Sequence, residues 1–211
     1  MRERPILFNG AMVRAILAGQ KTQTRRAVKP DGAVDVVRFI GADNQPTGEF
    51  GWCSNPSLIT RHIRCPFGQP GDRLWVRETT EADHDTSDAV TLSRYSADGA
   101  HVCYRAGTGD GFDGAIQHWR YSRNSRPSIH MPRDACRLVL EITAVRIERL
   151  HEISEADALA EGIDHDAMNG YALAGMHRSA GFAFRDLWTS TGGDWDSNPR
   201  VWVIDFKLVP A

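Results

Sequence analysis

The sequence lacks any apolar run long enough to cross a membrane. None of its stretches approaches the roughly 20 consecutive apolar residues that a transmembrane helix needs. The first ten residues, MRERPILFNG, also lack the apolar core and cleavage site of a secretory signal peptide. We therefore expect a cytoplasmic protein with no membrane partner.

Cysteine is scarce, and the charges nearly balance. The four cysteines are widely spaced and form no Cys-x-x-Cys pair, which argues against a zinc site or a disulfide framework. His84 lies among unpatterned aspartates, which is a weak metal signal. The formal net charge of −2 gives no overall basic signal. We expect reduced cysteines, no metal and no other cofactor. The cysteines are Cys53, Cys65, Cys103 and Cys136.

Positive charge is nevertheless concentrated near the N-terminus. Residues 1–30 contain one acidic residue, Glu3. Such a block can attract phosphate or a nucleic-acid backbone. The alternative is an ordinary solvated face, because runs of charge are usually that. The basic residues of the block are Arg2, Arg4, Arg14, Lys21, Arg25, Arg26 and Lys29.

The stretch LAGQKTQTRR, residues 17–26, is the feature around which we organise the chain. Upstream of it, Asn9 is a suitable N-cap and apolar residues recur at helical spacing, which predicts a helix from about Gly10 to Ala18. Gly19 ends that helix, because glycine accepts the left-handed conformation common past a helix C-terminus. The residues after Gly19 are typical of a strand, with Thr24 and Arg26 on one face and Arg25 on the other.

This stretch resembles the signature of the ASCH superfamily, which is related to the PUA fold. The resemblance implies an α+β protein with a small mixed β-barrel flanked by short helices. Within the superfamily, the N4-acetylcytidine amidohydrolase family has the same Lys-x-x-Thr spacing, and the resemblance implies that Lys21 and Thr24 are catalytic. It places the third catalytic residue at Glu161, in HEISEADALAEGI.

The resemblance covers residues 5–26, 70–79, 137–163 and 200–208. It implies one domain over residues 1–211, with large insertions at about 27–69 and 80–136. The layout is more like that of the longer ASCH proteins of phages and prophages. We expect the insertions to border the cleft, so the substrate need not be that of the small amidohydrolases.

The remaining elements are predicted from pattern alone. Residues 27–70 are loosely patterned with an edge strand near 34–37, residues 80–100 read as a mobile loop, and residues 164–175 read as a linker. A long strand at 136–150 changes phase at Thr143 and Ala144. Strands are also expected at 74–78, 101–107 and 200–209, the last of them a central strand. Helices are expected at 154–162 and 177–190, and in the first of these Ala158 and Leu159 face inward.

Three further groups are candidates for substrate binding. Glu78 ends a strand and is either a carboxylate beside the Lys21 site or a surface glutamate. Trp75, in the same strand, is either a core residue or part of the cleft. The stretch WRYSRNSRPSIHMPR interleaves aromatics with arginines, as in proteins that stack single-stranded bases, or its aromatics only anchor an insertion. The candidates in this arm are Trp119, Tyr121 and Arg126.

The candidate residues suggest amide hydrolysis. A lysine can activate a threonine hydroxyl only if its pKa falls toward neutral, and a close carboxylate opposes that fall. We therefore expect Glu161 to orient water or to pass a proton to the leaving amine. Lys21 then activates Thr24 or polarises the acyl oxygen, while Arg26 holds substrate or oxyanion, with Arg25 nearby.

The resulting function is hydrolysis of an N4-acylated cytosine nucleoside or nucleotide. Two alternatives stay open. The first is a module that binds or cleaves single-stranded RNA. The second is a non-enzymatic reader of modified bases, which would bind a nucleobase at the same cleft.

Overall fold

The computed structural model describes residues 1–28, 35–40, 46–55, 58–105 and 114–210. The chain forms two compact units. The first contains Met1–Arg2, Gly19–Asp72 and Glu141–Lys207. The second contains Glu3–Ala18, Arg73–Leu140 and Leu208–Ala211. The division into one domain with insertions stays a prediction.

The first unit is built on three strands: β2 (Gln23–Ala27), β10 (Val139–Arg149, entering from the second unit) and β11 (Arg200–Val209). β11 lies between β10 and β2 and pairs antiparallel with β2, with Ile204 opposite Thr24. Residues 201–204 are all buried, as expected of a strand covered on both faces, so the predicted central strand is confirmed. Along β10, Ile142 and Val145 are both buried, which confirms the predicted change of phase between them.

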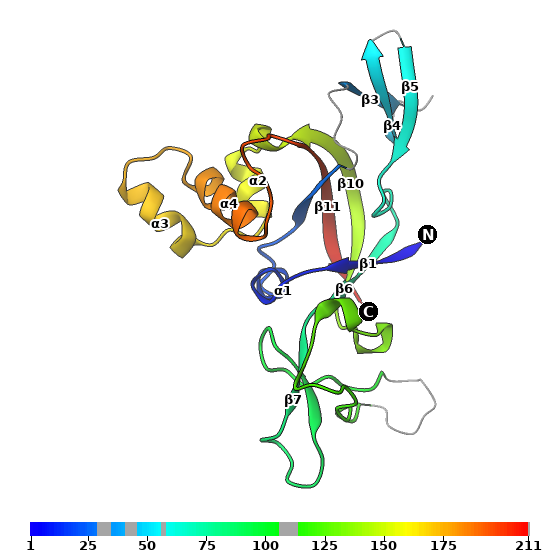
Figure 1. Cartoon of the computed structure of the whole chain (residues 1–211), viewed down its shortest axis with the longest axis vertical. Helices are drawn as coiled ribbons and strands as arrows, with labels where there is room; N and C mark the ends of the chain where they lie inside the picture. The colour runs from blue at the N-terminus through cyan, green and yellow to red at the C-terminus, as the bar shows by residue number, and fades with distance from the viewer. Residues whose placement is uncertain (29–34, 41–45, 56–57, 106–113, 211) are drawn as a thin grey trace. The chain divides into compact units, whose positions relative to one another are not determined.

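Three helices follow β10 in the chain: α2 (Glu155–Ala160), α3 (His165–Leu173) and α4 (Ser179–Ser190). Helices α2 and α4 lie on one side of β2, β10 and β11 (Figure 1). Residues of α2, α4 and β11 share one hydrophobic core. The predicted helices at 154–162 and 177–190 are confirmed. The core cluster consists of Leu150, Ile153, Ala158, Ile163, Ala180, Ala183, Phe184, Val201 and Val203.

Two expectations for this region are wrong. The expected linker at 164–175 is helix α3, which Asp164 caps by accepting a hydrogen bond from the backbone N–H of Ala167. Its apolar pattern is weak because none of its residues is buried. Leu159 was expected to face inward with Ala158, yet it is 44% exposed. Only Ala158 enters the core.

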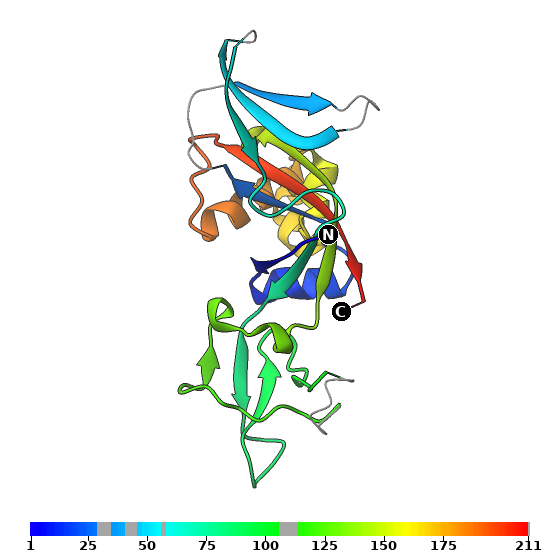
Figure 2. The same cartoon turned by 90° about the vertical axis from the view of Figure 1, so that its right-hand side faces the viewer.

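A small antiparallel sheet in the first unit contains β3 (Asp35–Ile40), β4 (Pro46–Asn55) and β5 (Leu58–Arg64), in the order β3-β4-β5 (Figure 2). The predicted edge strand is β3. Pattern reasoning missed β4 and β5, because glycine and proline interrupt this stretch and read as turns. The ring of Phe50 in β4 meets Trp202 of β11 edge-on, at 5.1 Å between centroids.

The second unit contains β1 (Glu3–Leu7), α1 (Gly10–Leu17) and β6 (Arg73–Arg77), with β1 and β6 parallel. The predicted helix is confirmed: Asn9 accepts a hydrogen bond from the Met12 N–H at 2.9 Å, and Gly19 follows with φ of +72°. The strand predicted at 74–78 is β6. The core cluster of this unit is Tyr95, Val102, Met131, Ala135, Cys136 and Val139.

Part of the expected loop at 80–100 is a second small sheet. β7 (Thr80–Asp83) pairs antiparallel with β8 (Leu92–Tyr95) and with β9 (Ser125–Arg126). Two of the acidic residues that indicated a loop are paired there: Glu81 accepts a 2.7 Å hydrogen bond from Arg94, and Asp83 lies 2.9 Å from His101 Nε2. The strand expected at 101–107 is wrong over its described part, where only isolated bridges form at His101 and Cys103. The glycine-rich loop after it lies outside the described residues.

The α+β class is therefore confirmed. The described strands form open sheets, and they do not close into the barrel that the family resemblance implies. Short 3₁₀ turns at Ser128–His130, Arg133–Ala135 and Leu150–Glu152 complete the regular structure. None of the described helices has the length and apolar character needed to span a bilayer.

Gly193, after α4, has no room for a side chain. An added Cβ would lie 2.3 Å from Nε1 and 2.6 Å from two ring carbons of Trp188. We expect Gly193→Ala to lower the free energy of unfolding by about 1–3 kcal/mol, the usual effect of overpacking. Urea denaturation measures this change. The matched control is Gly170→Ala in α3, where the added Cβ meets open space and helix propensity favours alanine. Equal effects in the two variants would show that the Trp188 contact is unimportant.

Candidate active site at Lys21 and Glu161

Thr22, just before β2, forms backbone hydrogen bonds with two other segments of the chain. The Thr22 N–H donates to the carbonyl of Ala160 at 2.8 Å, and the Phe206 N–H donates to the carbonyl of Thr22 at 2.8 Å. Lys21 and Glu161 form an isolated backbone bridge. The C-terminal end of α2 therefore lies against the start of β2, and two of the predicted catalytic residues, 140 positions apart, are neighbours.

The Lys21 ammonium is buried and well bonded. Its Nζ donates to the Gln23 carbonyl at 2.8 Å, to the Glu161 carbonyl at 2.8 Å and to Glu161 Oε2 at 2.5 Å. An ammonium has three N–H donors, so these three acceptors match it fully. Burial lowers the pKa of Lys21, while the charge of Glu161 and its hydrogen bond oppose that fall. The geometry favours the ammonium form, which has no lone pair with which to act as a base.

Glu161 has one carboxylate oxygen that no donor among the described residues reaches. The residue is only 3% exposed, and its Oε2 is bonded to Lys21. Its other oxygen, Oε1, is buried and accepts no hydrogen bond from the described residues. The nearby Arg25 Nη1 is 3.9 Å from Oε1. A buried acceptor without a donor is unfavourable, so this atom is where a bound N–H, hydroxyl or water gains most.

An ionic network surrounds the pair, and the sequence reading missed most of it. Arg25 is buried, 3.0 Å from Glu148 and 3.4 Å from Asp157. Gln23 donates to Asp157 at 2.8 Å and to Asp205 at 2.7 Å. Gln23 and Arg25 share the strand face that looks toward α2, as the two-residue period requires. Arg146 of β10 completes the network by binding Glu148, Asp157 and Asp205 at 2.5, 2.9 and 2.6 Å.

Asp157 connects this network to helix α2. Burial raises its pKa, but hydrogen bonds from Gln23 and Ser154 and the charges of Arg25 and Arg146 together lower it to about 2. The carboxylate is therefore ionised at neutral pH. The Asp157 carboxylate connects α2 to Gln23 and Arg25 of β2, and Glu161 follows Asp157 by about one helical turn.

Thr24 and Arg26 point to the other face of β2 by the same alternation. Thr24 is buried at 1% exposure, and Arg26 is half-buried. Burial lowers the pKa of Arg26, and the charge of Glu161 opposes this shift, so Glu161 is within electrostatic range of Arg26. The catalytic role of Thr24 and the substrate-binding roles of Arg25 and Arg26 stay predictions.

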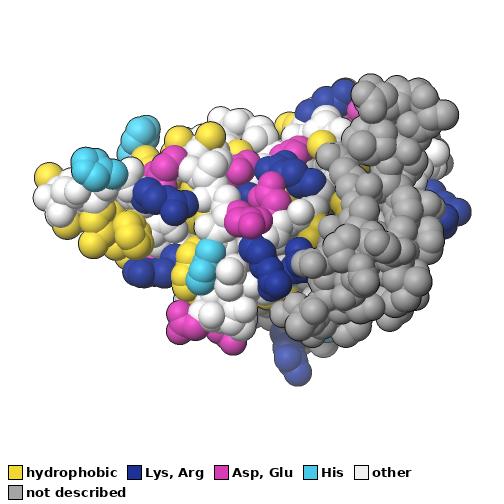
Figure 3. Space-filling model, turned by 90° about the horizontal axis from the view of Figure 1, so that it is seen from above, with side chains coloured by type: hydrophobic (Ala, Val, Ile, Leu, Met, Phe, Trp, Pro, Cys, Tyr) yellow, Lys and Arg dark blue, Asp and Glu magenta, His cyan; other side chains and the backbone are white. Residues whose placement is uncertain are grey.

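Part of the N-terminal cationic block is buried. Lys21 and Arg25 lie in buried ion pairs, so the solvated-face interpretation is wrong for these two residues, whereas attraction of phosphate stays a prediction. Lys29 lies outside the described residues. On the face shown in Figure 3, the coloured basic and acidic side chains are interspersed. Among the described residues, no group of three or more potential metal ligands is assembled.

Glu78 and Trp75 belong to the second unit. Glu78 is 1% exposed, and Arg137 binds both of its oxygens at 2.9 and 2.8 Å. The reading of Glu78 as a surface glutamate is therefore wrong, and burial raises its pKa although Arg137 opposes the rise. Trp75 is half-buried, with the guanidinium of Arg77 5.3 Å from its ring centroid. Their part in substrate binding stays a prediction.

The aromatic arm, residues 119–133, packs largely on itself. The Arg126 guanidinium lies 5.1 Å from the Trp119 ring centroid and 5.2 Å from that of Tyr121. Tyr121 also stacks with His130, and Trp119 Nε1 donates to the Arg123 carbonyl at 2.9 Å. These contacts lie within the arm itself, so base stacking and anchoring of an insertion both stay predictions for Trp119, Tyr121 and Arg126.

Comparison with known proteins gives structural matches alone. No protein-family model matches the chain, and no curated protein matches it. Two solved structures are similar over 100% of this chain and 81% of their own. One of the two is an ASCH domain. It comes from Lactobacillus crispatus JV V101, with 13% identity and a TM-score of 0.38. The other is an Enterococcus faecalis V583 protein of family DUF984, with 11% identity and a TM-score of 0.37.

Scores this low say nothing about activity. The proposals below therefore rest on the residues of this chain.

Proposed function

We propose that the chain is a hydrolase that cleaves the amide of an N4-acylated cytosine nucleoside or nucleotide, with Glu161 as the proton-transfer group. The observation that carries the proposal is Glu161 Oε1, a buried carboxylate oxygen held beside a buried ammonium, to which no described residue donates a hydrogen bond. The resemblance of the motif supplies the substrate class, and the geometry supports the chemistry.

In the proposed reaction, Glu161 first accepts a proton from a water molecule while the oxygen of that water adds to the acyl carbon. The tetrahedral intermediate then breaks its C–N bond, and Glu161 returns the proton to the leaving nitrogen. The products are the acid and the free exocyclic amine. One carboxylate thus acts as general base and then as general acid. The open Oε1 atom is the proton acceptor, because Oε2 is bonded to Lys21.

Lys21 is proposed to act through its positive charge. Its three acceptors keep the ammonium in place, and its bond to Oε2 fixes the orientation of the Glu161 carboxylate. Arg26 is the cation proposed to meet the developing oxyanion. Thr24 is then a binding residue, because a threonine nucleophile would need a base that the Lys21 ammonium does not provide.

The sequence neighbours of the pair are more exposed than the pair itself. Gln20 and Thr22, on either side of Lys21, are exposed, and Gly162 after Glu161 is half-buried. Glycine at 162 has φ of +88°, which few other residues adopt readily. We propose that substrate reaches the buried pair through a local opening at these neighbours.

The test is hydrolysis of N4-acetylcytidine to cytidine, with the cytidine measured by chromatography. We expect Glu161→Gln, which keeps the size of the side chain, to lower kcat at least about 100-fold, the usual contribution of a general base. The control is Glu141→Gln, where the carboxylate forms a surface pair with Lys207 and no large change is expected. Wild-type activity in Glu161→Gln would exclude the proposal.

Thr24→Val separates the two roles of the threonine. Valine keeps the shape and removes the hydroxyl, so a binding role predicts a loss of about 10-fold or less. A loss as large as that of Glu161→Gln would assign the nucleophile to Thr24 instead.

The alternatives predict different results in the same samples. Salt-dependent affinity for single-stranded RNA without turnover of nucleosides would favour the RNA-binding alternative. Binding of a modified base without turnover, unchanged in Glu161→Gln, would favour the reader.

A further inference from the structure

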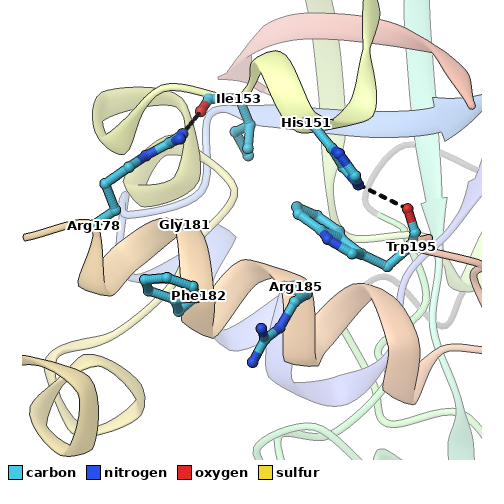
Figure 4. A pocket seen from close by; sticks show the side chains of 7 residues that line it. All are labelled: His151, Ile153, Arg178, Gly181, Phe182, Arg185 and Trp195. Carbon is cyan, nitrogen blue, oxygen red and sulfur yellow. Dashed lines mark hydrogen bonds between the residues drawn. The ribbon is translucent and has the colours of Figure 1, made fainter. Parts of the chain in front are cut away.

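The first unit has a cavity of about 220 Å³ beside α4, away from the residues of the Lys21–Glu161 pair. Figure 4 shows it between the α4 helix, the 3₁₀ turn before α2 and the loop that carries Trp195. Gly181 contributes no side chain, so the backbone of α4 forms part of the wall. The lining residues are His151, Ile153, Arg178, Gly181, Phe182, Arg185 and Trp195.

Flat rings form the apolar part of the wall. The His151 and Trp195 rings stack at 4.6 Å with 28° between their planes, and His151 Nε2 is 2.8 Å from the Trp195 carbonyl oxygen. The Phe182 ring stacks with that of Tyr171, with 5.5 Å between the ring centroids. These contacts fix the rings before any ligand binds, which lowers the entropic cost of stacking a further ring on them.

The polar part of the wall is cationic. Arg178 precedes α4 as its N-cap residue, Arg185 lies within the helix, and both line the cavity. The two carbonyl groups at the rim already accept hydrogen bonds, that of Ile153 from Arg178 at 2.6 Å and that of Trp195 from His151. The groups that remain for a ligand are mainly guanidinium donors, which suit an anion.

Each arginine has a carboxylate nearby, but both pairs are exposed. Arg178 Nε is 4.0 Å from Glu155, and Arg185 Nη2 is 3.3 Å from Asp186. Exposed ion pairs of this kind contribute little to stability. A ligand anion can therefore replace the carboxylate as the partner of either guanidinium.

We propose that this cavity binds a small planar aromatic anion. One ring lies against Trp195, and the anionic group lies at the rim on Arg178 and Arg185. The volume is below the roughly 300 Å³ of typical drug-sized sites, so it suits one ring system with its charged group outside. A nucleoside monophosphate and an aromatic carboxylate share this chemistry. The site is separate from the proposed hydrolase site.

The test is calorimetric titration of the full chain with AMP, adenosine, inorganic phosphate and indole-3-carboxylate. We expect AMP or indole-3-carboxylate to bind in the micromolar to millimolar range, and the tighter of the two shows which anion the rim prefers. Adenosine and phosphate alone are each expected to bind at least about 10-fold more weakly than AMP. Equal binding of adenosine and AMP, or no binding of either aromatic anion, would overturn the proposal.

Variants locate the binding. Arg185→Gln is expected to weaken binding at least about 5-fold, whereas Lys207→Gln, which removes a charge elsewhere in the first unit, leaves it unchanged. Asp186→Asn removes the competing carboxylate and is expected to tighten binding about 2- to 5-fold. Trp195→Leu is expected to weaken binding at least about 5-fold. Binding that is unaffected by both Arg185→Gln and Trp195→Leu would place the ligand elsewhere and contradict the proposal.

The two proposals fail independently. Glu161→Gln is expected to keep the affinity for the aromatic anion, whatever its effect on amide hydrolysis. Loss of binding in Glu161→Gln would assign the ligand to the hydrolase site and overturn the separate cavity site. We also expect titration with the aromatic anion to shift the NMR resonance of the Trp195 indole N–H. The loss of this resonance in Trp195→Phe assigns it.

Discussion

Lys21→Met is expected to lower the free energy of unfolding by about 3–5 kcal/mol, the usual effect of removing one partner of a buried ion pair. Methionine keeps the length of the side chain but leaves Glu161 as a buried carboxylate without its 2.5 Å partner. It also removes the donor from the carbonyls of Gln23 and Glu161. Urea denaturation near neutral pH measures the change.

The double variant Lys21→Met/Glu161→Met gives the sharper result. Replacing both members of a buried pair by apolar side chains is often close to neutral, because the desolvation of two charges disappears with their attraction. We expect the double variant to recover at least about 2 kcal/mol relative to Lys21→Met. Because the two carbonyls still lack a donor, recovery stays incomplete. If the two single effects simply added, the pair would not be coupled and the buried geometry would be wrong.

This experiment also separates structure from catalysis. A folded double variant without activity would show that the pair is needed for the reaction and not for the fold. Buried charged groups that reduce stability are common at functional sites, where perturbed pKa values cluster. The lowered pKa of Lys21 is consistent with such a site.

Local signals in the sequence were sufficient for the elements that carry the site. Asn9 and Gly19 mark the two ends of α1, Ser154 and Gly162 mark those of α2, and alternation marks β2. Each of these is decided by neighbours within a few residues. The pairing of Lys21 with Glu161 was available only through the family resemblance, because no local pattern relates residues 140 positions apart.

The network around Arg25 could not be predicted for the same reason. Arg146 and Glu148 were read as ordinary positions of a long strand, and their contacts depend on the register between strands and on where α2 packs. Glu78 shows the opposite error. A glutamate at the end of a strand is usually exposed, and only the position of Arg137, 59 residues later, explains why this one is buried. Helix α3 was missed because a helix with no buried residue has no apolar period to detect.

Arg137→Gln is expected to make the second unit unstable in a pH-dependent way. The wild-type guanidinium binds both oxygens of buried Glu78, both oxygens of Asp98 at 2.8 and 3.0 Å, and lies 3.8 Å from the Tyr95 ring centroid. Without it, Glu78 is a buried carboxylate with no cation. We expect the free energy of unfolding at pH 7.5 to fall by about 3–5 kcal/mol.

The sign of the pH dependence follows from Glu78. Burial already raises its pKa above the ordinary 4.5, and losing Arg137 removes the main opposing influence. The folded variant then holds a proton that the unfolded chain has released, so its stability falls as the pH rises from about 4.5 toward the folded pKa. Below about pH 4 both states are protonated, and the difference from wild type should shrink to about 1–2 kcal/mol, because the neutral acid still lacks hydrogen-bond partners.

The control for this prediction is Arg133→Gln. Arg133 binds Glu3 at 2.9 and 2.8 Å, but both side chains are about one-third exposed. Such a surface pair contributes about 1 kcal/mol or less. Denaturation of wild type and both variants at pH 4 and pH 7.5 therefore compares the loss of a buried arginine–glutamate pair with the loss of an exposed one, and only the buried pair predicts a pH-dependent difference. A loss in Arg137→Gln that is the same at both pH values would mean that Glu78 stays ionised without its partner. The buried position of its carboxylate would then be incorrect.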